Sequence, residues 1–275
     1  MKSAELIAFL DCEKTVMRVE ISRVRGSSPR EEGAVMFVSD GAMLGTIGGG
    51  QLEYMALDEA RKALKLNKYI CRMDVPLGPE IGQCCGGRVE ITLTQMDSSA
   101  RREAVAQIQA QEEAFPHVYV FGAGHVGRAL AEQFQHLPVH CVLIDSRSDE
   151  LDLSIADVEK RLTAVPEAEV RNAPAGSAFI VLTHDHALDF LVTSEVLELG
   201  SSRWLGMIGS STKRANFESF VRSHCTGLET ETLNCPIGVS GSRDKRPAVI
   251  AAMVVAEVIA ALTSEPAVQT SVPAS

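Results

Sequence analysis

Aromatic side chains are scarce in this sequence. They make up 5% of 275 residues, and Trp204 is the single tryptophan. A core must therefore be built mainly from aliphatic residues and alanine. Long apolar runs are also lacking: the longest, residues 248–262, has 15 residues and contains Glu257, whereas a membrane-spanning helix needs about 20. The sequence predicts no such helix.

Basic residues are outnumbered by acidic ones: the chain has 26 Lys and Arg against 36 Asp and Glu, which gives a net charge of −10. Nucleic acids and anionic membranes attract basic surfaces, so we expect neither as a partner. The seven cysteines are scattered and odd in number, which argues against a framework of disulfides. With no secretory pattern at the N-terminus, these features favour a cytoplasmic protein with free thiols.

The first 97 residues predict a mixed α+β domain. Apolar residues alternate in residues 17–21 and 88–95, which indicates half-buried strands. Asp40-Gly41 separates two strand-like segments and suits a tight hairpin turn. Residues 51–64 follow as an amphipathic helix.

The rest of the chain predicts a second architecture. Residues 98–116 are polar and helix-favouring, and we expect a helical linker there. Residues 117–264 alternate apolar strands with helices, which indicates an α/β Rossmann-like domain with a doubly wound parallel sheet. Its last helix, residues 247–263, is apolar nearly all round and is expected to be buried. Residues 265–275 are expected to form a disordered tail.

A glycine-rich turn follows the first strand of this second domain. Gly122, Gly124 and Gly127 have the spacing of a dinucleotide-binding turn, and Asp145 ends the next strand, where an acidic group meets a ribose hydroxyl. His125 would point into the ligand crevice. The alternative is that these glycines only permit close packing of helix and strand.

Two adjacent cysteines, Cys84 and Cys85, stand before a Gly-Gly pair. Neighbouring cysteines rarely form a structural disulfide, and they lack the spacing of a zinc site. A thiolate pair in a glycine-flanked loop is a candidate ligand for a redox metal or for sulfur transfer. The alternative is two small core residues before a strand.

A triple glycine, Gly48, Gly49 and Gly50, enters the amphipathic helix and is followed by Glu53. Ordering such a flexible segment is costly, which suggests a ligand beside it, and amides at a helix start suit a phosphate or carboxylate. A plain turn is the alternative. Arg30, in a second Gly-Ser turn, is a candidate counter-charge.

Two further groups end strands of the second domain. His184 and His186, with Asp185 between them, could ligate a metal, or Asp185 could simply cap a helix. Gly209 and Lys213 begin another helix in a segment rich in hydroxyls, a candidate anion site. Because strand ends share one edge of such a sheet, both groups should converge with the glycine-rich turn.

Several ordered blocks carry a family likeness, from about Val24 to Ala261. They are RGSSPREEGAVMFV, GTIGGGQLE, GQCCGGRVEI, YVFGAGHVGRALA, IDSRSDEL, THDHALDF, LGMIGSSTKRANF and CPIGVSGSRDKRPAVIAA. Together they resemble the XdhC/CoxI family.

The resemblance implies a maturation factor rather than an enzyme, with no catalytic residue. Such a factor binds molybdenum cofactor (molybdopterin), shields it while a cysteine desulfurase supplies the terminal sulfido ligand, and delivers it to xanthine dehydrogenase. Cys84 and Cys85 then become candidate molybdenum or sulfur contacts, and the glycine turns become candidate phosphate cradles. We expect a homodimer, the commonest closed assembly.

Two other functions remain open from the residues alone. An NAD(P)-dependent oxidoreductase is supported by the turn at residues 122–127 and by Asp145, and Arg147 could even favour a 2′-phosphate. A ligand-free interaction scaffold would leave the thiols and the glycine turns unexplained.

Overall fold

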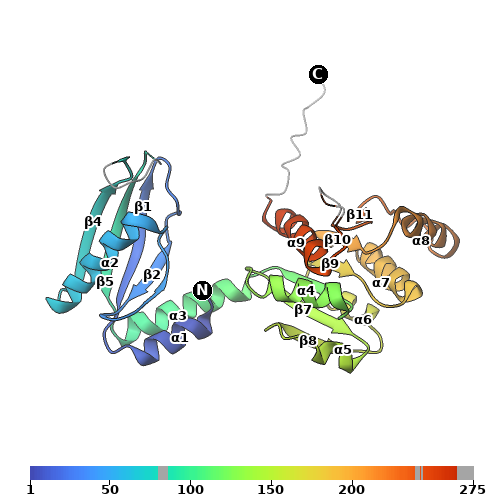
Figure 1. Ribbon diagram of the computed structural model, residues 1–275, viewed down its shortest axis with the longest axis horizontal. Helices are drawn as coiled ribbons and strands as arrows, with labels where there is room; N and C mark the ends of the chain where they lie inside the picture. Colours follow the sequence, from blue (N-terminus) through green and yellow to red (C-terminus); the bar gives the residue numbers. More distant parts are fainter. Residues whose placement is uncertain (80–85, 239–241, 243, 265–275) are drawn as a thin grey trace, which may run out of the picture. The chain divides into compact units, whose positions relative to one another are not determined.

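The computed structural model describes residues 1–79, 86–238, 242 and 244–264. The chain divides into two compact units, Met1–Ala114 and Phe115–Ser275, here called unit 1 and unit 2 (Figure 1). Within the described part of the chain, no helix is both long and apolar enough to cross a membrane.

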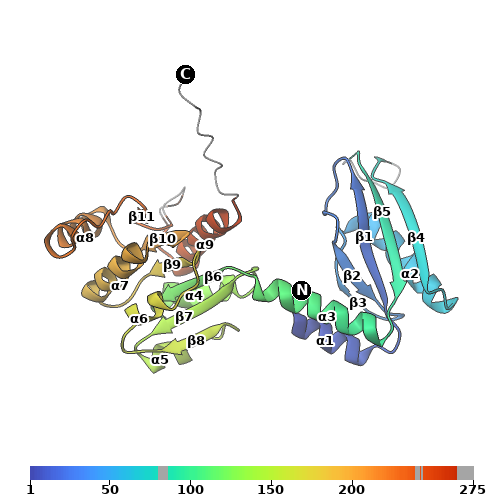
Figure 2. The ribbon, with the colours of Figure 1, turned by 180° about the vertical axis from the view of Figure 1, so that it is seen from behind.

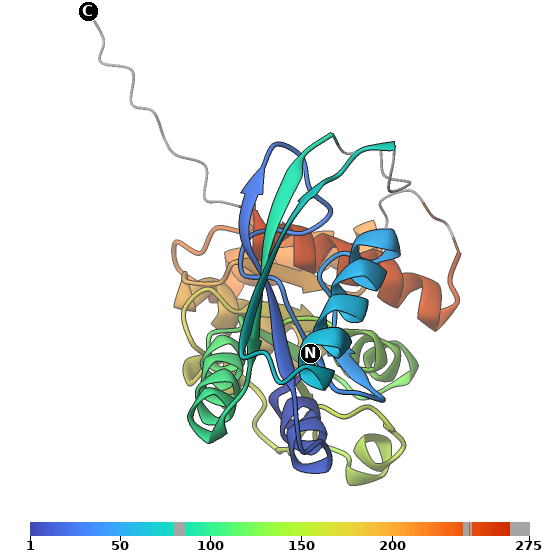
Figure 3. The same cartoon turned by 90° about the vertical axis from the view of Figure 1, so that its left-hand side faces the viewer.

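Unit 1 is built on an antiparallel sheet with the strand order β3-β2-β1-β5-β4. Its strands are β1 (Met17–Arg25), β2 (Val35–Val38), β3 (Met43–Gly45), β4 (Ile70–Pro76) and β5 (Arg88–Gln95). Helix α2 (Gly50–Lys65) packs on one face through residues spaced about one turn apart, namely Leu52, Ala56, Ala60 and Ala63. Figures 2 and 3 show α2 on one side of this sheet. The mixed α+β prediction is confirmed.

The alternation read from the sequence sets the strand register of unit 1. Met17, Val19 and Ile21 of β1 are fully buried beneath α2, because successive side chains of a strand point to opposite faces. The predicted turn at Asp40-Gly41 joins β2 to β3, and the Ser39 amide donates to the Ala42 carbonyl over 2.9 Å.

Helix α3 (Ser98–Glu113) belongs to unit 1, whereas we had expected a linker there. It packs through Ala104 and Ile108 against Leu6 and Leu10 of helix α1 (Ser3–Cys12). Its Arg101 guanidinium also donates to backbone carbonyls at the end of α1. Two apolar positions four residues apart give this otherwise polar helix a buried stripe.

Unit 2 is a six-stranded parallel sheet in the order β11-β10-β9-β6-β7-β8. Its strands are β6 (His117–Phe121), β7 (His140–Asp145), β8 (Glu159–Leu162), β9 (Ala178–Val181), β10 (Trp204–Met207) and β11 (Leu233–Asn234). This is the strand order of a Rossmann fold, with a switch point between β6 and β9. The predicted α/β class is confirmed.

Helices cover both faces of this sheet. Helices α4 (His125–Phe134), α5 (Ser148–Asp152) and α9 (Pro247–Thr263) share a core with Val118 and Val120 of β6. Helices α6 (Glu167–Arg171), α7 (His186–Leu199) and α8 (Ser211–His224) share the other core with Tyr119 and Phe121. Apolar side chains on both faces explain why the strand reads as a continuous apolar run.

One expectation for unit 2 needs correction. The stretch after β7 contains α5, β8 and α6, which are too short to show a clear period in the sequence. Helix α9 is not buried all round: Ala251, Val254 and Val258 form its buried face, while Ala252 and Ala256 are exposed. It lies in an outer layer, where only one face contacts the core. The expected tail lies outside the described residues.

Candidate functional site

Three glycine-rich segments meet at one place in unit 1. A Cβ atom added at Gly87 would lie 2.0 Å from the Ser27 carbonyl oxygen, and one added at Gly48 would lie 2.9 Å from Cγ of Pro29. The turn at residues 26–30, the triple glycine and the Gly-Gly pair are therefore packed together. We call this group the glycine cluster. Cys84 and Cys85 immediately precede the Gly-Gly pair in the sequence but lie outside the described residues.

The backbone conformation of this loop requires glycine at all three positions of the triple glycine. Gly48, Gly49 and Gly50 have φ values of +130°, +74° and +63°, a region that residues with a Cβ atom rarely adopt. A Cβ atom at Gly49 would contact nothing within 4 Å. The loop therefore turns its backbone toward open space as it enters α2.

Glu53 places a carboxylate inside this loop. Its Oε2 accepts hydrogen bonds from Thr46 Oγ1 at 2.5 Å, from the Gly49 amide at 3.1 Å and from the Ile47 amide at 3.3 Å. The side chain comes from the first turn of α2, and the residue is only half-buried. An anion is thus already present at the start of this helix, supplied by the chain itself.

Ser28 carries the other notable polar atom of the glycine cluster. Its Oγ is buried and has no hydrogen-bond partner in the part of the chain that the structure describes. Leaving a buried hydroxyl unpaired costs about 1–3 kcal/mol, so such an atom indicates a missing partner. Arg30 follows two residues later in the same turn. Its Cγ is 3.3 Å from a Cβ atom added at Gly48, and it forms no ion pair with a described residue.

In the glycine-rich turn of unit 2, two of the three glycines are needed for close packing of the backbone. A Cβ atom at Gly127 would lie 1.8 Å from the Gly122 carbonyl oxygen, and one at Gly122 would lie 2.3 Å from the Leu182 carbonyl oxygen. A Cβ atom at Gly124 would contact nothing within 4 Å. Only Gly124 leaves room for a ligand at the start of α4, where His125 is exposed.

Asp145 is fully engaged within the protein. Its side chain is 2% exposed and accepts from the Ala123 amide at 2.7 Å and from the amide and guanidinium of Arg147, each at 3.0 Å. Burial alone would raise the pKa of Asp145, but the Arg147 side chain and the two amides outweigh it and lower that pKa. The carboxylate predicted to meet a ribose is bound by Arg147.

The crevice beside Asp145 is nearly filled. The cavity lined by Gly122, Asp145, Pro166, His184 and Leu188 has a volume of about 10 Å³. That is room for about one water molecule.

The two other groups predicted in unit 2 do converge. Thr183, His184, His186, Gly209, Ser210 and Lys213 line a shallow pocket of about 300 Å³ where β9 and β10 end. Asp185 caps α7 and accepts from the Ala187 amide at 2.7 Å, the alternative that we had left open. Among the described residues, no three potential ligands lie close enough to hold a metal ion.

Lys213 is held by a residue that the sequence analysis did not single out. Its ammonium forms an ion pair with Asp189 and donates to the Ile208 carbonyl over 2.9 Å. The Asp189 side chain is fully buried and also accepts from the amide and hydroxyl of Thr183, at 2.8 and 2.7 Å. The signal for Asp189 in the sequence was an acid between two apolar residues, Leu188 and Phe190. This pair ties the ends of β9 and β10 together.

The two buried thiols of the described part of unit 2, Cys141 and Cys235, are poor soft ligands. Burial raises the pKa of Cys141 to about 12. Burial also raises the pKa of Cys235, and nearby Lys213 and Arg214 offset this only in part. Both thiols are therefore protonated near neutral pH, unlike the thiolates that bind metals.

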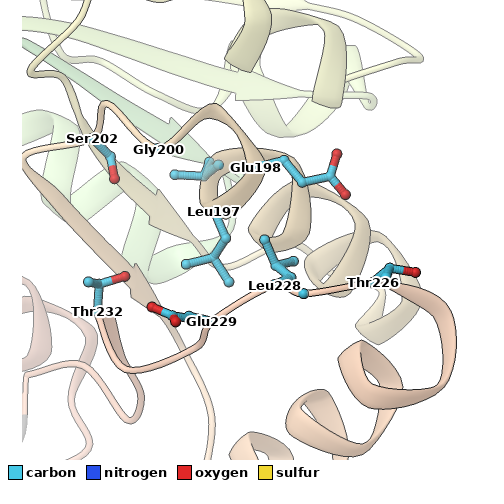
Figure 4. A pocket seen from close by; sticks show the side chains of 10 residues that line it. Leu197, Glu198, Gly200, Ser202, Thr226, Leu228, Glu229 and Thr232 are labelled. Atoms are coloured by element: carbon cyan, nitrogen blue, oxygen red, sulfur yellow. The ribbon is translucent and has the colours of Figure 1, made fainter.

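A larger pocket lies at the opposite edge of unit 2 (Figure 4). It has a volume of about 570 Å³ and lies where α7 ends and before β10 and β11 begin. Leu197 and Leu228 line it together with Glu198 and Glu229. Since its charged residues are acidic, it does not suit an anionic ligand.

Comparisons with known proteins agree with this architecture. Residues 118–258 match the model of the XdhC Rossmann domain, and residues 10–72 match that of the XdhC and CoxI family. The chain is 25% identical over 255 residues to the uncharacterized protein YqeB of Escherichia coli (strain K12), covering 88% of this chain but 42% of that protein. It also resembles in fold a crystal structure described as a xanthine dehydrogenase from Bacillus halodurans, with a TM-score of 0.79, 19% identity and coverage of 99% and 98% of the two chains.

Proposed function

Because this chain belongs to the XdhC and CoxI family, we propose that it is a maturation factor for xanthine dehydrogenase. In this proposal it binds molybdenum cofactor as cargo, shields it while a cysteine desulfurase supplies sulfur, and hands it to the enzyme. The observation that carries the proposal is the glycine cluster of unit 1. It combines open backbone with a buried hydroxyl and an arginine that have no partner among the described residues.

The two ends of the cargo call for different chemistry. Its phosphate suits backbone amides at the start of α2, the hydroxyl of Ser28 and the guanidinium of Arg30. Its dithiolene and metal end is soft and suits thiolates. Cys84 and Cys85 stand next to the cluster in the sequence and supply that chemistry in this proposal.

Glu53 holds the backbone amides that an incoming phosphate would bind. Its half-buried carboxylate already accepts from the Gly49 and Ile47 amides. An incoming phosphate can take over these donors while Glu53 turns toward solvent. The empty site is thereby kept ordered without the cargo.

The geometry of unit 2 gives less support to an NAD(P)-dependent oxidoreductase. The Arg147 guanidinium donates hydrogen bonds to the carboxylate of Asp145, and the adjoining cavity has a volume of about 10 Å³. Lys213, the expected cation of the neighbouring pocket, is neutralised by Asp189. A nucleotide would have to displace Arg147 and enlarge the crevice.

The first test is to identify the small molecules that co-purify with the protein from cells able to make molybdenum cofactor. Wild-type protein should carry pterin and molybdenum. Ser28→Ala should lower pterin retention at least fivefold, although it removes an unpaired buried hydroxyl and so leaves the empty protein as stable as before or more so. Cys84→Ala and Cys85→Ala should lower the molybdenum or sulfur content more than the pterin content.

Gly124→Val serves as the matched control in unit 2. Its side chain would block a phosphate at the start of α4, so it should leave pterin retention unchanged if the glycine cluster is the site. Loss of pterin in Gly124→Val alone would move the site to unit 2. Bound nicotinamide nucleotide without pterin would support the oxidoreductase instead.

A deletion strain tests the role in the cell. Xanthine dehydrogenase should still accumulate there with its iron–sulfur and flavin groups, but should be inactive for lack of sulfurated cofactor. Normal xanthine oxidation in that strain would contradict the proposal.

A further inference from the structure

The face of the unit 1 sheet that points away from α2 carries an unusual set of charges. Figures 1 and 2 view this sheet from opposite sides. On β1, β5 and β4 the side chains outside the α2 core include five arginines, Arg18, Arg23, Arg25, Arg72 and Arg88, and three acids, Glu20, Asp74 and Glu90. We call this set the arginine face. It is locally basic in a chain whose net charge is −10.

Each acid of the arginine face is matched by one arginine. The three ion pairs are Arg18–Glu20, Arg25–Glu90 and Arg88–Asp74. Arg23 and Arg72 remain, both exposed, and neither forms an ion pair with a described residue. Two cations are therefore left over on a face whose other charges cancel.

A β-bulge places these two arginines beside a hollow. The register of β1 against β5 shifts between Ile21 and Arg23, and such bulges redirect side chains. Ser22, Arg23, Arg72 and Thr92 line a shallow pocket of about 540 Å³. Asp74 and Glu90 line it too, and both are ion-paired, with Arg88 and Arg25. The Thr92 hydroxyl donates to Ser22 Oγ, and the Ser22 hydroxyl donates to the Glu90 carbonyl, each over 3.1 Å.

We infer that the arginine face is a docking surface for an acidic segment of a partner protein. Arginine binds carboxylates in a bidentate manner and suits protein interfaces. Arg23 pairs with Glu90 of β5 and Arg72 pairs with Thr92, so the two backbones are two strand spacings apart and two residues out of register, roughly 12 Å. That separation is close to the roughly 13 Å between residues i and i+4 of an extended segment, whose side chains point to the same side.

Charge complementarity favours this occupant over a nucleic acid. Nucleic-acid binding relies on many cations along a phosphate backbone, and this face has two that lack an ion pair with a described residue. An acidic segment needs only a few carboxylates, and its binding should be fast and sensitive to salt. This inference stands on the arginine face alone and does not rest on the proposed function.

The test uses the full chain and a fluorescently labelled octaglutamate peptide, with anisotropy measured at 20 and 300 mM NaCl. Wild-type protein should bind the peptide at low salt and at least tenfold more weakly at high salt. The double variant Arg23→Gln/Arg72→Gln should bind at least tenfold more weakly at low salt. Arg102→Gln/Arg222→Gln, which removes two exposed arginines elsewhere, should bind like wild type.

Three outcomes would overturn the inference. The first is no binding by wild type, and the second is an equal loss in both double variants, which would indicate net charge alone. The third is equal binding of an octaglutamine peptide. Competition by millimolar inorganic phosphate that fully displaces the peptide would reassign the pocket to a small anion. Because all four arginines are exposed, unchanged thermal unfolding should verify that both variants fold.

Discussion

The two glycine-rich turns, one in each unit, begin helices in similar ways and differ in what surrounds them. Each has a carboxylate of the same chain that accepts from its backbone amides, Glu53 in unit 1 and Asp145 in unit 2. Asp145 is buried and bound by Arg147, whereas Glu53 is half-buried and has no arginine or lysine partner among the described residues.

This difference decides whether an external anion can replace the carboxylate. We call the turn of unit 2 closed, because its carboxylate stays bound, and the turn of unit 1 exchangeable, because its carboxylate can be replaced. In unit 2 the carboxylate has two backbone donors and a guanidinium, so an external anion gains little by replacing it. In unit 1 the carboxylate can leave at small cost, because solvent reaches it. The same motif therefore stabilises the sheet edge in unit 2 and offers a binding site in unit 1.

The largest expected effect tests whether packing fixes the unit 2 glycines. Gly127→Ala should destabilise the protein by about 3 kcal/mol or more, because its Cβ atom would lie 1.8 Å from a backbone oxygen and helix and strand would have to separate. Gly124→Ala, which meets open space, should change the free energy of unfolding by less than about 1 kcal/mol. Urea denaturation of both variants measures this, and equal losses would refute the distinction.

The next effect tests how strongly the Asp145 carboxylate stabilises the unit 2 turn. Asp145→Asn should cost about 2 kcal/mol at pH 7, because hydrogen bonds to a charged partner are lost. The folded-state pKa of Asp145 is lowered, so the stabilisation is complete above the unfolded value of about 3.9 and is lost as the pH falls below it. The gap between wild type and Asp145→Asn should therefore stay constant down to about pH 4 and shrink as the pH falls further, and a gap that stays constant below that pH would contradict it.

Much of the fold could be predicted from the sequence because its signals are local. Alternation at Met17, Val19 and Ile21 defined a strand, and the Asp40-Gly41 turn defined a hairpin. The continuous apolar strands of unit 2 defined a parallel sheet. Helix α9 was misjudged because its composition is apolar all round, and composition does not reveal which face meets the core.

The candidate site was harder to predict because it depends on contacts between distant residues. The sequence marked the Ser28 turn, the triple glycine and the Gly-Gly pair separately, and only the fold packs them together. Lys213 was expected to face a ligand, but its partner Asp189 lies 24 residues earlier. No local pattern indicates that such a cation is already neutralised.

A smaller effect concerns the backbone of the unit 1 turn. Gly49→Ala should cost about 1 kcal/mol, since alanine must adopt a φ of +74° although its Cβ atom meets open space. Gly124→Ala, at a φ of −65°, is the control that adds the same atom without that strain. If Gly49→Ala costs no more than this control, the turn relaxes freely and is not held in the observed conformation.

The smallest expected effect on stability concerns Glu53. It tests whether this carboxylate competes with the phosphate of the cargo or contacts the cargo directly. Glu53→Gln keeps an acceptor for the Gly49 amide but loses the charge, so the empty protein should lose only about 0.5 kcal/mol. If the carboxylate competes with the phosphate of the cargo, removing its charge should raise pterin retention about two- to fivefold. Glu112→Gln, in unit 1 but outside the glycine cluster, controls for the change in net charge. Lower retention in Glu53→Gln would show instead that the carboxylate contacts the cargo, and the exchangeable turn would have to be abandoned.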